Sequence, residues 1–168
     1  QTRVAAISES VAREMGLPRS RIAGLRMAGE VHDIGKLAVP TGILSKPTKL
    51  NEGEMALIQN HPKVGYEIVK DIEFPWPIAK IILQHHERLD GSGYPNGLFG
   101  EHILPEAKIM AVADVLDAMA SHRPYRPALT TEKAISEILD GKGTLYDPDV
   151  VEACVKLLKE GKLDPYLP

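Results

Sequence analysis

This 168-residue chain is poor in several features that mark other classes of protein. Its single cysteine, Cys154, excludes an internal disulfide and fits a reducing compartment such as the cytoplasm. No apolar run approaches the ~20 residues of a membrane-spanning helix, so we expect no membrane contact by this domain. The net charge of −3 argues against a surface for nucleic-acid polymers.

The alternating pattern of strands is also missing, and helical patterning takes its place. Asn51 and Glu54 match a capping box, and Asp147 precedes another apolar helical run. Gly35 is expected to end the helix that comes before it. The sequence therefore predicts a single all-α domain over residues 1–168.

The opening residues are already in helical rhythm, with Val4, Ile7 and Val11 on one face. A complete helix usually has a capping residue just before its first turn, and none precedes this one. We therefore expect a first helix that is truncated at its N-terminus, in a fragment of a longer regulatory protein.

Histidines on apolar helical faces are the first candidates for chemistry. In "VHDIGK", His32 continues such a face with Asp33 beside it, and Lys36 can reach back over the same point. A lone histidine there is more often a core residue than a metal ligand. In "IAKIILQHHE", however, His85 and His86 both extend the isoleucine stripe. Two buried imidazoles need partners, and a metal satisfies both more simply than separate hydrogen bonds.

The helix "AKIMAVADVLDAMAS" is apolar nearly all round, which indicates burial. A buried carboxylate needs a partner or a cation, and we expect Asp114 to be a metal ligand and Asp117 to form a structural pair. Arg123 and Arg126 follow in a loop. Their guanidinium groups suit phosphate oxygens, although two solvated arginines are the ordinary alternative.

Taken together, these donors point to metal chemistry. Imidazole and carboxylate without thiolate suit Fe, Mn or Zn. Two such metals can activate water and clamp a phosphoryl group. The residues therefore favour a metal-dependent phosphohydrolase, whereas "GSGYPNG" does not match the dinucleotide motif GxGxxG.

The segments "HDIGK" and "HHERLDGSGYP" resemble the HD-GYP domain family, a branch of the HD phosphohydrolase superfamily. The similarity continues through "HPKVGYEIV" and "ILPEAKIMAVADVLDAMASHRPYRPA" and covers essentially the whole chain. It implies a helical bundle with a short GYP loop and two or three divalent metal ions, usually iron or manganese. It also implies hydrolysis of the bacterial second messenger cyclic di-GMP to pGpG and on to GMP.

The resemblance implies roles for particular residues. The implied metal ligands are His32, Asp33, His61, His85, His86 and Asp114. Asp33 would bridge two metals and, with Lys36, serve in catalysis. The implied substrate contacts are Lys36, Tyr94, Pro95, Arg123 and Arg126.

Four further residues of these motifs receive other expectations. Glu87 and Asp90 would orient the histidines and brace the loop. His102 and His122 match no ligand position and are expected at the surface. The family's first histidine ligand, and the glutamate of members with a third metal, would both fall before Gln1, so the metal count stays open.

Two other functions also stay open. The site could act on another cyclic dinucleotide, such as cyclic GMP-AMP, or on a metabolic nucleotide, since nothing in the sequence fixes the base. The domain could instead sense a nucleotide or dock a partner without turnover, although the intact ligand positions favour catalysis. The resemblance further implies a covalently linked receiver or sensory domain in the full-length protein.

Overall fold

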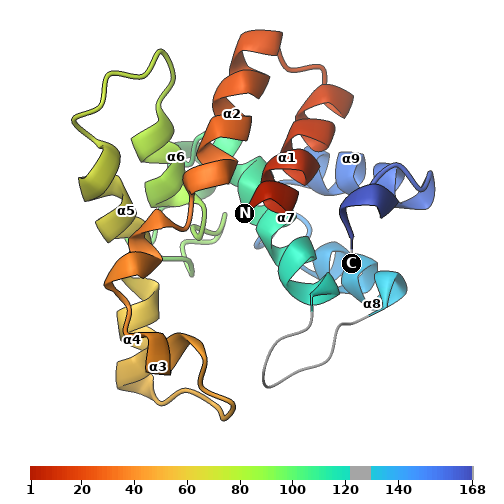
Figure 1. Ribbon diagram of the computed structural model, residues 1–168. Helices are drawn as coiled ribbons and strands as arrows, with labels where there is room; N and C mark the ends of the chain where they lie inside the picture. The colour runs from red at the N-terminus through yellow and green to blue at the C-terminus, as the bar shows by residue number, and fades with distance from the viewer. Residues whose placement is uncertain (122–129, 168) are drawn as a thin grey trace.

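The computed structural model describes residues 1–121 and 130–167, and its regular structure is helical (Figure 1). The α-helices are α1 (Thr2–Glu14), α2 (Arg19–Val31), α3 (Thr41–Leu44), α4 (Glu52–Gln59), α5 (His61–Val69), α6 (Ile78–Gln84), α7 (Pro105–Ala120), α8 (Thr131–Asp140) and α9 (Pro148–Lys159). Three short 3-10 helices join them: η1 (Ile34–Ala38), η2 (Gly100–His102) and η3 (Asp164–Tyr166). The described ranges contain isolated bridges but no strand, so the all-α prediction is confirmed. None of the described helices is long and apolar enough to cross a membrane.

Local sequence signals set most of the helix ends. At the start of α4, Asn51 Oδ1 accepts from the Glu54 amide and the Glu54 carboxylate accepts from the Asn51 amide, both at 2.8 Å, so the capping box is confirmed. Asp147 likewise caps α9. The expectation that Gly35 ends a helix is wrong, because α2 ends at Val31 and Gly35 lies inside η1.

An apolar core surrounds α7, which packs against α1, α2, α6, α8 and α9 (Figure 1). Met110 and Leu116 of α7 are fully buried, as are Ile7 of α1 and Ile82 of α6. Complete burial of each such side chain stabilises the fold by about 1.5–3 kcal/mol. This core fixes the C-terminal ends of α2 and α6 against the middle of α7, where the candidate site lies.

Residues 40–60, which include α3 and α4, form an arm of a different kind. No residue of this arm is buried, and it extends away from the bundle in Figure 1. Met55 is 42% exposed and Leu57 is 51% exposed. Its loop is closed by an ion pair of 2.7 Å between Lys46 Nζ and Glu54 Oε2. Because the arm has no core of its own, local caps and ion pairs hold its conformation.

Candidate metal centre

The six predicted ligands are brought together from segments that are far apart in the sequence. His32 and Asp33 follow α2, His61 begins α5, His85 and His86 follow α6, and Asp114 lies in the middle of α7. His32, His61 and His85 are at most 1% exposed. The other three are partly buried. The structure thus places all six around one region, while their roles as ligands stay predictions.

Three of the four histidines are held in the same way. His32 Nδ1 donates to the Gly29 carbonyl (2.7 Å), His61 Nδ1 to the Ile58 carbonyl (2.7 Å) and His85 Nδ1 to the Ile82 carbonyl (2.6 Å). Each acceptor lies three residues earlier, in the last turn of α2, α4 or α6, where carbonyl groups lack helical partners. Since a carbonyl can only accept, Nδ1 carries the proton, and Nε2 of each neutral ring carries a lone pair. Metal-ligating histidines are commonly fixed by such a bond.

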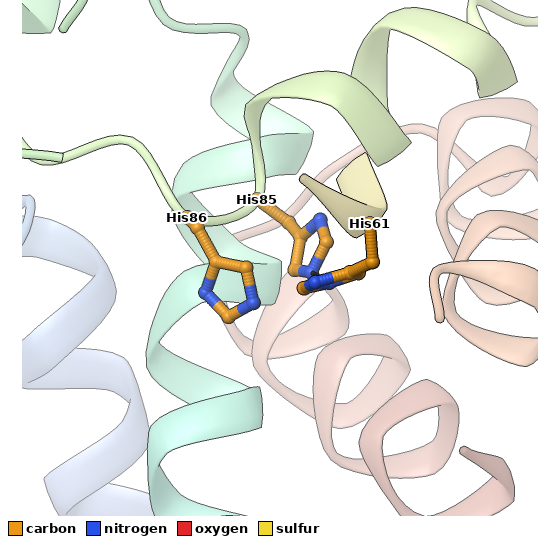
Figure 2. A group of neighbouring side chains, drawn as sticks. All are labelled: His61, His85 and His86. Carbon is orange, nitrogen blue, oxygen red and sulfur yellow. Dashed lines mark hydrogen bonds between the residues drawn. The ribbon is translucent and has the colours of Figure 1, made fainter. Parts of the chain in front are cut away.

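The Nε2 atom of His61 faces groups that cannot donate to it. It lies 3.3 Å from His85 Nε2 and 3.2 Å from Asp33 Oδ1. Figure 2 shows the rings of His61 and His85 meeting, with His86 beside them. Asp33 Oδ1 is buried and, among the described residues, has no hydrogen-bond partner. Lone pairs and a carboxylate oxygen at these distances repel one another unless a cation or a proton lies among them.

On the other side of Asp33, His32 faces two carboxylates. Its Nε2 lies 3.5 Å from Asp33 Oδ2 and 3.7 Å from Asp114 Oδ1. Burial lowers the pKa of His32, but Asp114 and Asp33 outweigh burial and raise the pKa above its ordinary value. The two carboxylates thus favour positive charge at His32 Nε2, whether a proton or a metal ion supplies it.

The remaining titratable groups are poised as ligands. Burial would raise the pKa of Asp33 and Asp114, but the facing imidazoles, with Lys36 beside Asp33, hold both far below the ordinary value. Burial, together with the charge of His32, lowers the pKa of His85 to about 3. Burial and the neighbouring His85 also hold the pKa of His86 well below its ordinary value. The carboxylates are thus ionised and these two imidazoles neutral, as metal binding requires.

These residues fit divalent cations. Two overlapping groups have one donor atom per residue within 4.8 Å of the others: His61, His85 and His86, and His32, Asp33 and His85. A set of imidazole nitrogens and carboxylate oxygens suits Fe, Mn or Zn. Oδ1 of Asp33 faces His61 while Oδ2 faces His32, which is compatible with the expected bridging role. The orphaned oxygen of Asp33 and the opposed Nε2 lone pairs are what a bound cation would satisfy.

Gly35 allows close contact at this point of the chain. A Cβ there would overlap the His61 carbonyl oxygen and lie 2.6 Å from the Gly65 amide nitrogen. The glycine therefore lets η1 pack directly on the start of α5, which brings Asp33 to His61. Lys36 Nζ lies 2.7 Å from Asp33 Oδ2, so the predicted reach of this lysine is confirmed. The reason is the 3-10 turn of η1, in which residues three apart face each other, and not a helix stop.

The loop after α6 is braced by two carboxylates. Glu87 is 2% exposed and accepts from the amides of Asn96 (2.8 Å) and Leu98 (2.9 Å). Asp90 accepts from the amide (2.9 Å) and hydroxyl (2.6 Å) of Ser92. The expected bracing is confirmed. Within the described part of the chain, however, neither carboxylate bonds to a histidine, and the helix-end carbonyls do the orienting instead.

Tyr94 returns to the site through this loop. Its ring stacks on His86, with centroids 4.7 Å apart and planes inclined by 29°. Its peptide bond to Pro95 is cis. Burial, assisted by the charge of Asp114, raises the pKa of the Tyr94 hydroxyl well above its ordinary value, so the hydroxyl stays protonated.

A cavity of about 490 Å³ opens over the ligands. Its walls include five of the six predicted ligands, all except His85, together with Lys36 and Tyr94. Two of the predicted substrate contacts are therefore at the cavity, whereas Pro95 is not among its lining residues. Arg123 and Arg126 lie outside the described residues.

Several residues have structural roles, as expected. Asp117 also faces the cavity, but its Oδ1 accepts from Arg3 Nε at 2.6 Å, which confirms the structural pair. Cys154 is fully buried, and burial raises the pKa of its thiol to about 12, as for a core residue. The His102 side chain is 66% exposed, while His122 lies outside the described residues.

Comparison with known proteins places this architecture among characterised relatives. The profile of the HD domain family matches residues 1–150. The chain is 44% identical over 156 residues to the cyclic di-GMP phosphodiesterase response regulator RpfG of Xanthomonas campestris, covering 92% of this chain and 41% of that protein. It is 36% identical to the 3'3'-cGAMP-specific phosphodiesterase 3 of Vibrio cholerae, covering 93% of this chain and 34% of that protein. The fold is similar to an HDG"Y"P protein from Bdellovibrio bacteriovorus, with a TM-score of 0.78 and 21% identity over 94% of this chain and 51% of the other. The chain thus spans less than half the length of both sequence relatives.

Proposed function

Because this chain belongs to the HD domain family, in its HD-GYP branch, we propose that it is the hydrolase domain of a longer protein and cleaves cyclic di-GMP to pGpG and then GMP. The observation that carries the proposal is the meeting of His61 Nε2 with His85 Nε2 and with Asp33 Oδ1, an oxygen that has no hydrogen-bond partner among the described residues, beneath a cavity. The printed name of the Xanthomonas relative supports the choice of substrate. Its name also describes a response regulator, which supports a linked receiver or sensory domain.

The proposed metal ions are two or three, with iron or manganese as the preferred elements. The residues that would hold them are His32, Asp33, His61, His85, His86 and Asp114. When bound, such ions would supply Lewis acidity, which lowers the pKa of water and neutralises charge on a phosphoryl oxygen.

The chain's own residues would then place the substrate. Lys36 Nζ is bound to Asp33 at 2.7 Å and its side chain is 32% exposed at the cavity, so it can turn toward a phosphate oxygen. Because Lys36 Nζ lies beside the carboxylate that would hold a metal, its ammonium would stabilise negative charge on a phosphate oxygen placed there. We propose that Arg123 and Arg126 bind further phosphate oxygens, on the basis of the family resemblance and the chemistry of guanidinium.

A product assay tests this function. The protein would be loaded anaerobically with Fe(II) or Mn(II) and given cyclic di-GMP, with products resolved by chromatography. We expect pGpG and GMP from the unaltered protein. Asp33→Ala should lose both metal binding and turnover, since no other carboxylate lies against both His32 and His61 among the described residues. The exposed Asp71→Ala, in the turn after α5, is the matched control and should retain both. Full turnover in Asp33→Ala would refute the mechanism.

A mixed cyclic dinucleotide is the second candidate substrate. It is favoured by the 36% identity to a 3'3'-cGAMP-specific phosphodiesterase. Competition between cyclic di-GMP and 3'3'-cGAMP in one reaction separates the two candidates. The substrate with the higher kcat/KM is the one for which the site is built.

A further inference from the structure

The fourth histidine of the centre is held differently from the other three. Among the residues that the structure describes, no hydrogen bond reaches either ring nitrogen of His86. Rings surround it instead: Tyr94 stacks at 4.7 Å and 29°, His85 lies at 4.0 Å and 40°, and His61 presents an edge at 5.0 Å and 84°. We propose that Tyr94 is a positioning residue, whose ring fixes the orientation of His86 for metal binding as backbone carbonyls fix the other histidines.

Geometry explains why a carbonyl does not serve here. Successive residues of a helix point about 100° apart around the helix axis. His85 and His86 are successive, so both cannot use the same carbonyl geometry and still reach one site. An offset ring stack stabilises beyond the area that it buries, by an amount comparable to one hydrogen bond, so a ring can take the place of a carbonyl here.

The loop holds Tyr94 against the residue that it supports. The Tyr94 amide donates to the His86 carbonyl at 3.2 Å. A Cβ on Gly93 would lie 2.5 Å from that carbonyl oxygen, so the loop folds back this closely only because residue 93 is glycine. The buried Glu87 fixes the chain beyond, through the amides of Asn96 and Leu98. Backbone and ring contacts thus join the same two residues.

The stack also bears on the expected contact between Tyr94 and substrate. One face of the Tyr94 ring is covered by His86, and only the remaining surface lines the cavity. A role in positioning needs the ring, whereas a polar contact with substrate needs the hydroxyl. This inference rests on the metal site of the proposed function, but not on which nucleotide the site accepts.

Two substitutions separate the ring from the hydroxyl. Tyr94→Phe keeps the stack, and Tyr94→Leu removes it. Mn(II) affinity would be measured by electron paramagnetic resonance of the free ion, and the ligand field by the absorption spectrum of the Co(II)-loaded protein, both without substrate. We expect Tyr94→Phe to match the unaltered protein. Tyr94→Leu should bind Mn(II) about 10- to 100-fold more weakly and show an altered Co(II) spectrum. Tyr66→Leu, a partly buried tyrosine of α5 that is not part of the centre, is the control and should change neither.

A double-mutant cycle with His86→Ala tests the route of the effect. If Tyr94 acts through His86, adding Tyr94→Leu to His86→Ala should weaken Mn(II) binding no further. An equal loss in both backgrounds would overturn the proposal, as would unchanged Mn(II) affinity and Co(II) spectrum in Tyr94→Leu. In a separate turnover assay, an increase in the KM for cyclic di-GMP that Tyr94→Phe shares with Tyr94→Leu, without any change in metal binding, would show a substrate contact through the hydroxyl. That result would also overturn the proposal. If Tyr94→Leu does not fold, Tyr94→Met fills the space without a ring and takes its place. The metal-binding measurements contain no substrate, so they do not depend on turnover. Absence of cyclic di-GMP turnover would therefore refute the proposed function and leave the comparison of the Tyr94 variants valid.

Discussion

The candidate metal centre and the arm of residues 40–60 adjoin at His61, yet they are built in opposite ways. His32, His61 and His85 are buried and are fixed by backbone carbonyls at helix ends. The arm buries none of its residues and is held by a capping box and an ion pair. Side chains that are fixed by backbone atoms need little reorganisation to bind a ligand, whereas an element without a core can change shape at low cost.

The two regions meet through one bond. The carbonyl of Ile58, in the last turn of the arm, accepts from His61 Nδ1 at 2.7 Å. The last turn of α4 therefore serves the centre, whereas within the described part of the chain no other residue of the arm hydrogen-bonds to the side chain of a candidate ligand. The comparison predicts that changes near this junction have large effects and that changes farther along the arm have small ones.

A single methyl group at the junction is expected to have a large effect on both stability and metal binding. Gly35→Ala would overlap the His61 carbonyl and push η1 from α5, so we expect a loss of about 2–3 kcal/mol in unfolding free energy and weaker metal binding. Gly42→Ala is the matched control, because a Cβ on Gly42 in α3 meets no atom within 4 Å. It should be neutral or should stabilise by up to about 1 kcal/mol. Urea unfolding measures the stability of both variants, and Mn(II) titration measures their metal affinity. Equal effects of the two substitutions would contradict the contrast between the junction and the rest of the arm.

Much of this arrangement could be read from the sequence, because local rules carry it. The apolar periodicity predicts the helices, Asn51 and Glu54 predict a cap that forms, and the buried surroundings of Asp114 predict its need for a cation. His61 was different. No periodic face marks it, and only the family resemblance predicts it as a ligand, whereas in the structure its Nε2 lies 3.3 Å from His85 Nε2.

What could not be predicted depends on contacts between distant segments. Gly35 lets the backbone of His61 and Gly65, in another helix, pack closely against it. A local sequence pattern shows only that a glycine is present. The hydrogen bonds from histidine Nδ1 to helix-end carbonyls have a local signal, because each histidine follows a residue of the last helical turn by three positions. The signal is weak, since helix ends predicted from sequence are uncertain by one or two residues. The stack of Tyr94 on His86 requires the fold of a loop that no periodicity describes.

The buried centre should also make the metal-free protein sensitive to acid. The pKa of His85 is about 3 in the fold and about 6.5 in an unfolded chain. Between these values the unfolded chain binds a proton that the folded chain does not, so stability falls as pH decreases, by about 1.4 kcal/mol per pH unit. The depressed pKa of His86 has the same sign. The raised pKa of His32 opposes it, because its contribution is present at low pH and lost as pH rises through that pKa.

Between pH 6.5 and pH 5 His32 opposes this loss only weakly, because its raised pKa acts mainly above pH 6.5. We therefore expect His85 alone to cost about 1.6 kcal/mol over this interval, with His86 adding to the loss, measured by urea unfolding of the metal-free protein. His85→Leu should reduce this dependence on pH, because it removes a group that titrates only in the unfolded chain. The exposed His102→Gln should leave it unchanged. A stability that is constant or rises toward pH 5 would show that His85 and His86 are not the buried, neutral imidazoles described above.

The smallest effect is expected on the arm itself. Leu57 is 51% exposed on α4, so Leu57→Gln should change the unfolding free energy by less than about 0.5 kcal/mol and leave Mn(II) affinity unaltered. Ile82→Ala, at a fully buried position of α6, should cost about 2–5 kcal/mol in the same urea titration. Both residues are large and aliphatic, and they differ in whether a core surrounds them. A loss above 1 kcal/mol in Leu57→Gln would mean that this leucine packs against something in solution, and the arm would then have to be regarded as a folded part of the domain and not as an appendage of it.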